Sequence, residues 1–534
     1  MKKTDYKAQI QERIDALKEL LNAYYPEATE EIADFDEPQF RELEPITADE
    51  WALTHPLRQM AASDKFYAAL ATKLQKEFVR IPIGAQVRDE AIPLVAMMMA
   101  AYLEDIVSET GIWQATRNLY KARFGATLPF YDIDPDNYFE DDINMEDLKL
   151  LCWIAFNRAG ASCDMSYSPI SPGWEMLAEV GFEILVDNFE KAPVCSRAAR
   201  TLLSILQSGD YYKLRSLGLW LSADCPLTND PELRFSIIDS TESFLRESEE
   251  NETPISAPMA AYISESSAAW AKYMSMLGCP ASKYLAEIAR IHNMPEMAAK
   301  LETVKTVSYS AFQIVDSDSK YFHLVDLAGQ KFNVCRSSFK TMPDLHKRPW
   351  VLTSLAQFGN EYVVSGMAVF TDSKPSYEEI TTLSEFPEEK LEELRRVVKK
   401  HRGQRVFYLR SVDEISELLE GAMTISCTED GANIEPQNLV LLISDTVAPV
   451  VIPDRASCFK DRKNPFYDSS NKELNGKKAW EIVGTYAFAD DVIDYIVEKK
   501  LLSDATMYAS QGKRVAKRIT QDNLAFLMRF YRSC

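Results

Sequence analysis

The sequence lacks the local motifs by which many enzyme classes are recognised. It contains no GxSxG nucleophile elbow, no Walker loop and no GxGxxG dinucleotide fingerprint. None of its five histidines has Glu three residues before it or another His within five residues, so HExxH zinc sites and the ExxH motif of di-iron bundles are absent too. The sequence therefore indicates no cofactor and no metal ligand set. It leaves open a catalytic site assembled from distant residues.

Paired cysteines and a membrane-spanning run are missing as well. Nine cysteines are scattered singly without a CxxC pair, a pattern typical of reduced thiols. The opening residues 1–25 predict an amphipathic helix rather than an apolar signal core. The most apolar run ends at Glu104 and Asp105, well short of the roughly 20 residues needed to cross a bilayer. We expect a cytoplasmic protein with no membrane anchor.

Positive charge is scarce relative to negative charge. The formal net charge is −22 over 534 residues. Binding to nucleic acid depends on neutralising phosphates, so this charge argues against a protein that binds nucleic acid over its whole surface. Hydrophobic residues make up 46% of the chain, which is enough to build real cores in two to four domains.

The periodicity of apolar residues predicts an α+β fold that is predominantly α. Residues 1–48 predict a helix and an acidic linker, and Thr47 with Glu50 has the spacing of a capping box. Residues 49–303 predict helices of ordinary length joined by short connections, as in bundles or helical solenoids. Residues 304–371 change to a period of two, which predicts a small SH3/OB-like β-barrel. Its five expected strands are Ser308–Asp316, Tyr321–Leu327, Lys331–Val334, Pro349–Phe358 and Tyr362–Phe370.

Residues 372–534 predict a mixed α/β domain that ends in basic helices. The helix expected at Pro387–Arg402 has acidic residues first and basic residues last, which complements the helix dipole. The other expected elements are strands Val406–Leu409, Ala422–Cys427, Val440–Ser444 and Val450–Ile452, and helices Val412–Leu419, Ala489–Lys500 and Thr520–Tyr531.

Acidic residues supply one set of candidate site residues. Glu104, Asp105 and Glu109 are candidates for inward carboxylates that hold a metal ion or a proton, although solvated or locally hydrogen-bonded carboxylates at a helix end are the more common case. Asp132, Asp134 and Asp136 partly match the start of a calcium loop, but the glycine expected at its sixth position is missing. We favour an exposed acidic loop there.

Basic residues interleaved with aromatic residues supply a second set. Such a pattern can hold a phosphate backbone and stack bases. We favour the plainer interpretation that this basic end docks on the acidic helical body of its own chain; nucleic acid, an anionic protein or a small phosphate ligand are the alternatives. Cys458 lies among these basic residues, which can lower a thiol pKa. A single Cys without a positioned His is more often structural or idle, and we favour that interpretation. The candidates are Arg455, Lys460, Arg462, Lys463, Phe466, Tyr467, Lys513, Arg514, Lys517 and Arg518.

Three strings in the helical part carry a resemblance: LEDIVSETGIW at 103–113, LYKARFGATLPFY at 119–131 and DDINMEDLKLLCWI at 141–154. They resemble an uncharacterised family of proteins from Bacteroidales genomes, a domain of unknown function. The likeness continues through His55-Pro56 and the NPFYD string at 464–468, and so covers most of the chain. The resemblance implies a lineage and a cytoplasmic location, and it brings no activity or catalytic residue.

Two hypotheses follow. The first is a non-catalytic cytoplasmic interaction or scaffold protein, in which a helical platform binds an unknown protein partner. The alternative is a nucleic-acid-associated factor or an enzyme with a site between the helical body and the basic C-terminal domain.

Overall fold

Helices build the part of the chain from Ala48 to Glu302, which we call the helical body. The computed structural model describes residues 43–81, 91–159, 167–250, 255–270, 277–327, 329–339, 349–375, 388–419, 438–504 and 513–531. The helices of the body are α3 (Ala48–Leu53), η1 (Pro56–Arg58), α4 (Asp64–Val79), α5 (Ala91–Ser108), α6 (Ile112–Phe124), α7 (Met145–Ala159), α8 (Pro172–Phe189), α9 (Ser196–Ser208), α10 (Tyr211–Ala223), α11 (Pro231–Glu250), α12 (Ala257–Ala268), α13 (Ala281–Ile291) and α14 (Pro295–Glu302).

These helices agree with the predicted helical domain, and the predicted capping box is present. Thr47 Oγ1 accepts a hydrogen bond from the backbone N of Glu50 at 3.2 Å, and the Glu50 carboxylate accepts one from the backbone N of Thr47 at 2.7 Å. This reciprocal pair fixes the start of α3 two turns before His55. The predicted helix at 1–25 and most of the acidic linker lie outside the described residues.

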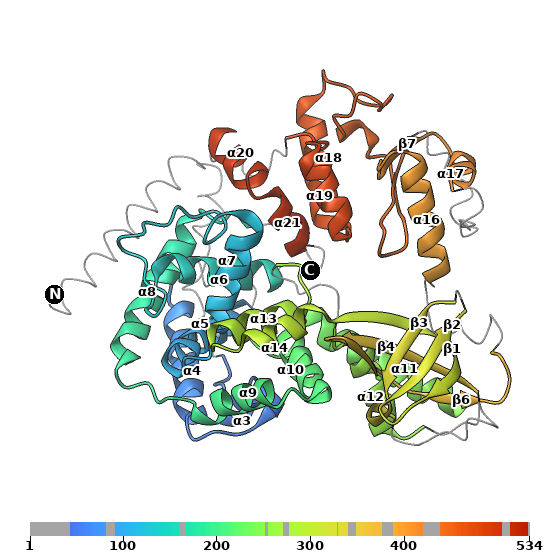
Figure 1. The fold of residues 1–534 in the computed structure, drawn as a ribbon. Helices are drawn as coiled ribbons and strands as arrows, with labels where there is room; N and C mark the ends of the chain where they lie inside the picture. Colours follow the sequence, from blue (N-terminus) through green and yellow to red (C-terminus); the bar gives the residue numbers. More distant parts are fainter. Residues whose placement is uncertain are drawn as a thin grey trace.

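Helix α5 is the core of the helical body (Figure 1). It packs against α4, α7 and α8, and because it is apolar almost all round, its neighbours bury it on every side. Among the described residues it is the one helix long and apolar enough to cross a membrane, yet 72% of that stretch is buried inside the protein. This burial is typical of the core helix of a soluble protein, as the sequence predicts.

The β-strands between Lys305 and Thr371 form a closed barrel, as predicted. Its strands are ordered β1-β2-β3-β5-β4, and β4 pairs back with β1. The barrel has its own core, built around Phe312, Phe322 and Phe332. The strands are β1 (Lys305–Ser317), β2 (Tyr321–Asp326), β3 (Lys331–Cys335), β4 (Trp350–Phe358), β5 (Glu361–Val364) and β6 (Val369–Thr371).

One expectation for the barrel is wrong. Residues 362–370 do not form a single strand, because the chain breaks after Val364 into β5 and β6. At the break the backbone N of Ser365 donates to the carbonyl of Ser354, while its own carbonyl accepts from Arg215 on α10. The break therefore ties the barrel to the helical body, and β6 extends the sheet beside β4.

The C-terminal part contains a three-stranded antiparallel sheet. Figure 1 shows the helices that accompany it. Helix α18 begins in the basic segment Arg455–Lys478 and continues to Thr485, and it was not predicted. The expected helix Thr520–Tyr531 is instead two helices, divided at Asp522 and Asn523. The expected strand Ala422–Cys427 lies outside the described residues. The elements are α16 (Glu388–Lys400), β7 (Val406–Leu409), α17 (Val412–Leu418), β8 (Leu439–Leu442), β9 (Val450–Pro453), η5 (Ala456–Cys458), α18 (Lys472–Thr485), α19 (Asp490–Glu498), α20 (Lys513–Gln521) and α21 (Leu524–Phe530).

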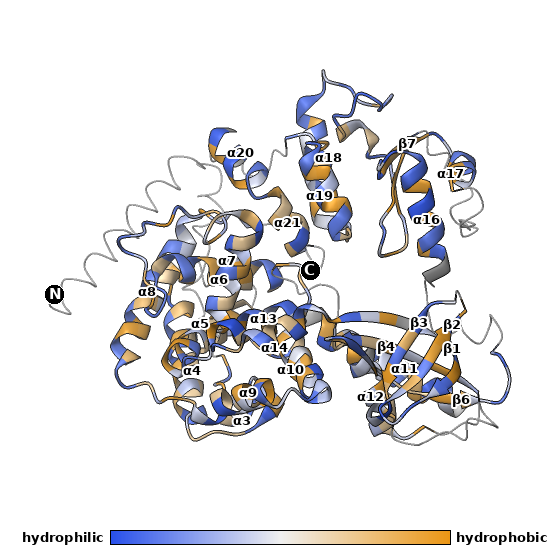
Figure 2. Cartoon of the chain, in the orientation of Figure 1, coloured by the Kyte–Doolittle hydropathy of each residue, from blue (hydrophilic) through white to orange (hydrophobic). Residues whose placement is uncertain are grey.

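Apolar side chains connect this C-terminal part to the helical body. One continuous cluster of buried side chains runs from Trp51 in α3 to Tyr531 after α21. Its aromatic contacts at the junction include Trp153 with Phe530, whose ring centroids are 4.5 Å apart. Figure 2 shows apolar residues on α21 and more polar ones on α16. The chain end is therefore anchored mainly by aromatic packing.

Candidate functional site

The acidic candidates near the end of α5 have different surroundings. Asp105 is buried, and its carboxylate accepts hydrogen bonds from the backbone N of Ile112 at 2.9 Å and of Trp113 at 2.8 Å, and from the Thr110 hydroxyl. Burial raises the pKa of Asp105 above its usual range, although these hydrogen bonds act in the opposite direction. Asp105 therefore holds the start of α6, whereas Glu109 is exposed.

Glu104 faces a different group of residues from Asp105, and it too is buried. Its carboxylate lies 3.2 Å from Nε2 of His55 and accepts a hydrogen bond from the indole N of Trp51 at 3.1 Å. The expectation that the helix-end carboxylates face water is wrong for Glu104 and Asp105, because α3 and the loop after it cover the end of α5. Asp105 is locally hydrogen-bonded, whereas Glu104 is an inward carboxylate that contacts His55 and Trp51 from a distant part of the chain.

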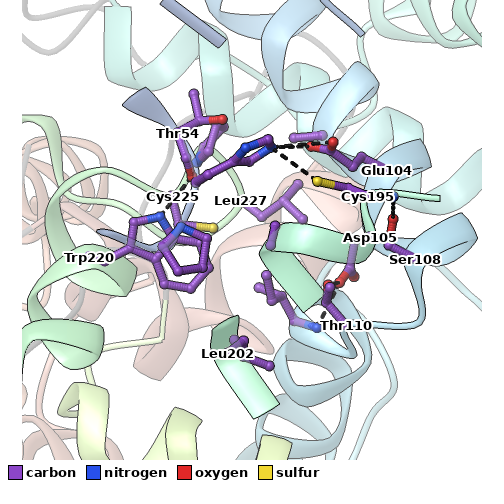
Figure 3. A pocket seen from close by; sticks show the side chains of 16 residues that line it. Thr54, Glu104, Asp105, Ser108, Thr110, Cys195, Leu202, Trp220, Cys225 and Leu227 are labelled. Carbon is purple, nitrogen blue, oxygen red and sulfur yellow. Dashed lines mark hydrogen bonds and ion pairs between the residues drawn. The ribbon is translucent and has the colours of Figure 1, made fainter. Parts of the chain in front are cut away.

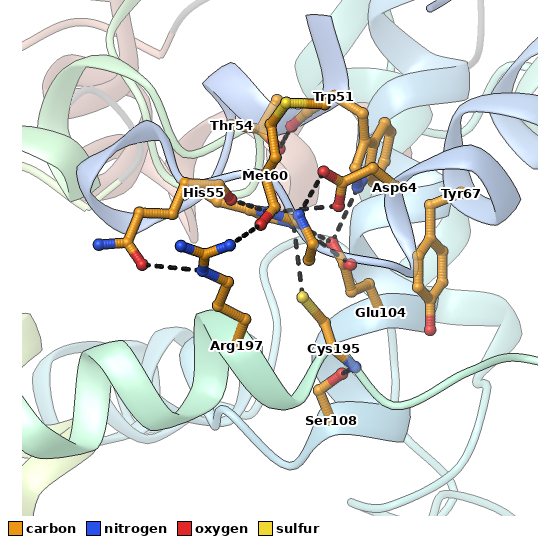
Figure 4. A network of polar contacts seen from close by, with 12 residues as sticks. Trp51, Thr54, His55, Met60, Asp64, Tyr67, Glu104, Ser108, Cys195 and Arg197 are labelled. Carbon is orange, nitrogen blue, oxygen red and sulfur yellow. Dashed lines mark hydrogen bonds and ion pairs between the residues drawn. The ribbon is translucent and has the colours of Figure 1, made fainter. Parts of the chain in front are cut away.

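The same histidine brings together two further residues from distant parts of the chain. Sγ of Cys195, the residue that precedes α9, lies 3.8 Å from Nε2 of His55. Oδ1 of Asp64, the first residue of α4, lies 3.5 Å from Nδ1 of His55. Figure 4 shows Asp64, Glu104 and Cys195 around the imidazole. We call His55, Asp64, Glu104 and Cys195 the His55 cluster.

Backbone contacts hold the members of the His55 cluster in place. The backbone N of Cys195 donates to Oγ of Ser108 at 2.8 Å. Oδ2 of Asp64 accepts from the backbone N of Ala61 at 2.7 Å. Oδ1 of Asp64 is buried and has no hydrogen-bond partner, which is uncommon for a buried carboxylate oxygen.

Electrostatics keep His55 protonated in this arrangement. Burial by itself would lower the pKa of His55, but the hydrogen bonds to Cys195 and to Glu104 outweigh burial and raise it to about 11. The imidazole is then positively charged at neutral pH and has no free nitrogen lone pair. The charged imidazole is therefore paired with the buried carboxylates of Glu104 and Asp64.

A small cavity lies next to the His55 cluster. Its volume is about 40 Å³, which is room for roughly three water molecules and too little for a metabolite. Figure 3 shows Glu104, Asp105 and Cys195 at its wall, opposite Trp220 and Leu227. All the lining residues fall between Thr54 and Leu227, so the cavity is not at the junction with the C-terminal part.

Two segments cover the cluster, residues 53–65 with η1 and the start of α4, and residues 191–200 with the start of α9. We call these two segments the covering face. Leu57 and Arg58, just after His55, have positive φ angles of 57° and 52°. Such angles are uncommon for residues other than glycine, and they persist only where surrounding contacts hold them. Arg197 supplies such contacts, because it donates to the carbonyl of Met60 at 2.8 Å and to the side chain of Gln59 at 3.2 Å.

The first group of basic candidates finds its partners inside the C-terminal part. Arg455 forms an ion pair with Glu481 at 3.0 Å and Lys460 one with Asp504 at 2.9 Å. Lys463 donates to Gln404 at 2.6 Å, and Arg462 is exposed. These described contacts differ from the favoured prediction of docking on the helical body, because acidic residues of the same domain lie nearer.

The aromatic candidates and their neighbours serve a local turn. Phe466 and Tyr467 are half-buried. The side chain of Asn464 donates to the carbonyls of Ala456 at 2.7 Å and Phe459 at 2.9 Å. The NPFYD string at 464–468 is thus explained by the turn that it makes. The alternative of a lowered pKa for Cys458 is wrong, since burial raises its pKa to about 12 despite nearby Lys478 and Arg455, as befits a buried structural cysteine.

The second group of basic candidates lies on α20. Lys513 begins this helix, and Arg514, Lys517 and Arg518 are exposed. Arg518 forms an ion pair with Asp132 in the acidic loop at 3.1 Å. Asp132 is 92% exposed at its side chain, so this contact between basic end and acidic body is a surface one, and such pairs contribute little to stability.

No local pattern in the sequence reveals the His55 cluster. His55 and Cys195 are 140 residues apart. Each residue stands just before a helix, and neither has another metal-ligating residue near it in the sequence at the spacing of a known motif. Two features of the sequence point toward the cluster. The His55-Pro56 dipeptide is part of the resemblance to the uncharacterised family, and Glu104 is one of the acidic candidates. The structure adds His55, Asp64 and Cys195 to Glu104, and it separates Glu104 from Asp105 and Glu109.

Comparison with protein families agrees with the resemblance of the three strings. A family model described as "Protein of unknown function (DUF3843)" matches residues 46–306 and 361–532, which is more than half of the chain. The match includes the helical body and the C-terminal part. Most of the barrel lies in the gap between the two matched ranges. No curated protein and no solved structure matches the chain.

Proposed function

We propose that this chain, which belongs to the DUF3843 family of proteins of unknown function, is a non-catalytic interaction protein whose covering face binds an acidic segment of a protein partner. The observation that carries the proposal is the composition of that face, where exposed apolar and basic side chains surround the buried His55 cluster. Its apolar part is Leu53, Leu57, Met60 and Val194, exposed by 54%, 47%, 54% and 55%.

These apolar side chains are concentrated rather than scattered. Twelve large apolar side chains are exposed in the described part of the chain, and four of them fall in these two segments. Isolated exposed apolar residues are ordinary on protein surfaces, but several together mark a site of contact with another molecule. The contact that Arg197 makes with the Met60 carbonyl ties the two segments into one surface.

The charge of the covering face is opposite to that of the whole protein. Residues 53–65 and 191–200 include Arg58, Lys65, Lys191, Arg197 and Arg200, all exposed, while Asp64, their only acid, is buried. Of these, Arg58 pairs with Asp224 outside the face at 3.6 Å. On a chain of net charge −22, such a region attracts acidic groups that the rest of the surface repels. We therefore expect the partner to offer acidic residues around apolar anchors.

The neighbourhood of the cluster supports binding without turnover. The adjacent cavity admits only a few water molecules, so it has no room for a substrate of metabolite size. The resemblance to Bacteroidales proteins and the scattered positions of the cysteines in the sequence, without a CxxC pair, support a cytoplasmic protein of that bacterial order. The alternative, a factor that binds nucleic acid through Arg455–Lys478 and α20, is less favoured, because Arg455 and Lys460 already have acidic partners.

Site-specific photo-crosslinking in the native organism tests the proposal. A photoreactive residue at Leu57 or Val194 is expected to give an adduct of defined mass with one protein, and the crosslinked peptide is expected to be acidic. The matched controls are Val186 on α8 and Leu474 on α18, which are similarly exposed apolar residues on other surfaces. Equal adducts at the control positions, or adducts with RNA, would contradict the proposal.

Charge reversal then tests the recognition chemistry with the purified partner. Lys65→Glu combined with Arg200→Glu is expected to weaken binding at least about 10-fold, and more so at low salt. Lys517→Glu on α20 is the control, since it changes an exposed charge outside the covering face. A larger effect from Lys517→Glu would move the binding surface to the C-terminal part.

A further inference from the structure

The His55 cluster combines the side-chain types that bind transition metals. One ligand atom each of His55, Asp64 and Cys195 lies within 4.8 Å of the other two, and all three residues are buried. Within the described residues this is the one such group of three or more. Thiolate, imidazole and carboxylate together suit zinc or a similar divalent ion, because zinc accepts all three ligand types.

We propose that His55, Asp64 and Cys195 bind a divalent transition metal ion of the zinc class. Tetrahedral zinc holds its ligand atoms roughly 3.3–3.6 Å apart. The imidazole nitrogens already lie 3.5 Å from Oδ1 of Asp64 and 3.8 Å from Sγ of Cys195. The two contacts involve different nitrogens. Nδ1 also lies 3.3 Å from the Gln59 carbonyl and Nε2 lies 3.2 Å from Glu104, so binding requires the imidazole to turn and exchange one of these contacts for the ion.

Among the described residues, Oδ1 of Asp64 accepts no hydrogen bond and has only the His55 imidazole, 3.5 Å away, as a partner. This is a second observation that points to a ligand. A buried carboxylate oxygen normally accepts a hydrogen bond, because burial without a partner is unfavourable. Oδ1 of Asp64 has none, although the other oxygen of the same carboxylate is held by the backbone N of Ala61. It lies beside the imidazole, as Figure 4 shows. A metal ion would give this oxygen a second partner.

The surroundings provide what such a site needs beyond three ligands. His55 precedes η1, Asp64 is the first residue of α4 and Cys195 precedes α9. The helix starts therefore fix the backbone position of each ligand. Glu104 lies 3.2 Å from Nε2 of His55 and either joins the ion as a fourth ligand or holds a water that does. The adjacent 40 Å³ cavity has room for that water.

Binding is a proton exchange with no change of oxidation state. The ion displaces the thiol proton of Cys195 and the second imidazole proton of His55 to solvent, and thiolate, imidazole and carboxylate become its ligands. Without the ion, the carboxyl groups of Asp64 and Glu104 and the sulfur of Cys195 face one charged imidazole. The ion adds positive charge to this buried group of acidic side chains. In this arrangement the metal fixes the two segments of the covering face from beneath.

Cobalt titration of the full-length chain after treatment with a chelator tests this site. We expect one Co²⁺ per chain, with the near-ultraviolet charge-transfer absorption of a cobalt–thiolate bond, and loss of that absorption when Zn²⁺ is added. Cys195→Ser is expected to remove the absorption and to weaken binding at least about 10-fold. Asp64→Asn is expected to weaken binding similarly while the absorption remains at saturation.

Cys152→Ser is the matched control, because Cys152 is a buried cysteine on α7 outside the cluster. It should leave both affinity and absorption unchanged. Near-ultraviolet circular dichroism of each variant shows whether it is folded, and Asp64→Asn decides the question if Cys195→Ser does not fold. No bound Co²⁺, or absorption that persists without Cys195, would overturn the proposal. These measurements use the isolated chain, so they stand apart from any result on a protein partner.

Discussion

Sγ of Cys195 lies 3.8 Å from Nε2 of His55, although 140 residues separate the two in the chain. This contact joins the segment after α3 to the segment before α9 over the end of α5. The outer surface of these two segments is the covering face, with its exposed apolar and basic side chains. The four side chains of the His55 cluster are buried beneath it. Binding of a partner and binding of a metal ion are thus proposed for the two sides of one structural unit.

The first prediction concerns the stability of this unit without metal. His55→Ala removes the charged partner of Glu104 and leaves a buried carboxylate with only the Trp51 indole as a hydrogen-bond donor. We expect the free energy of unfolding in urea to fall by about 3 kcal/mol. His323→Ala in the barrel is the control, since His323 is partly exposed, and its effect should stay below about 0.5 kcal/mol. Equal effects would show that the buried pair is not a stabilising contact.

The second prediction concerns pH and Asp105. Burial raises the pKa of Asp105 in the folded protein above the unfolded value of about 3.9. The folded state therefore binds a proton more tightly, and the resulting stability is present below that value and lost as the pH rises through the folded pKa. Asp105→Asn does not titrate, and it also loses one hydrogen-bond acceptor for the backbone N atoms of Ile112 and Trp113.

We expect Asp105→Asn to be less stable than the wild type by about 2 kcal/mol in acid, and this difference to narrow as the pH rises toward neutrality. Urea unfolding at a series of pH values measures it. The matched control is Glu109→Gln, which changes an exposed carboxyl group four residues away and should show no narrowing. A difference that widens with pH would mean that the folded pKa of Asp105 is depressed.

The third prediction separates aromatic packing from charge in the anchoring of the chain end. Phe530 is fully buried against Trp153, so Phe530→Ala should destabilise the protein by about 3–5 kcal/mol. Arg518→Ala breaks only an exposed ion pair with Asp132 and should change stability by less than about 1 kcal/mol. Thermal unfolding measures both. The reverse order would restore the prediction that opposite charges dock the basic end on the helical body.

The fold could be predicted from the sequence wherever one periodicity continued long enough. The capping box at Thr47, the buried helix α5 and the alternating strands of the barrel each follow from a local pattern, and each is confirmed. The single strand expected at 362–370 is wrong because its break depends on contacts of Ser365 with Ser354 and Arg215, which lie outside the segment. Local pattern carries no information about such contacts.

The candidate site was mostly beyond prediction for a similar reason. Glu104 and Asp105 are neighbours in sequence and share one helix end, yet one faces His55 and the other caps α6. Only the packing of α3 and α9 against α5 decides this. A histidine and a cysteine 140 residues apart have no common motif, so their meeting is a property of the folded chain.

The fourth prediction concerns the reactivity of Cys458. Burial raises its pKa to about 12, so its thiolate fraction at neutral pH is roughly 1000-fold lower than that of a free cysteine. We expect no labelling by iodoacetamide in the native protein and full labelling after denaturation in urea, followed by mass spectrometry of the peptide. The reference is a short peptide with the same residues around Cys458. Labelling of the native protein at the rate of that peptide would mean that the basic neighbours activate the thiol.

The last prediction concerns nucleic acid. Arg455 and Lys460 are paired with Glu481 and Asp504, and the whole chain carries a net charge of −22, so little positive potential remains to hold phosphates. We expect weak binding of labelled single-stranded RNA at low salt, measured by fluorescence anisotropy, and no further loss in the variant Lys460→Glu, Arg462→Glu, Lys463→Glu. Tight binding of RNA at low salt that falls steeply at physiological salt and disappears in this variant would instead establish Arg455–Lys478 as a phosphate-binding surface.

In that case the covering face would no longer be the main site of interaction. The steep salt dependence would then measure the phosphates held by the C-terminal part.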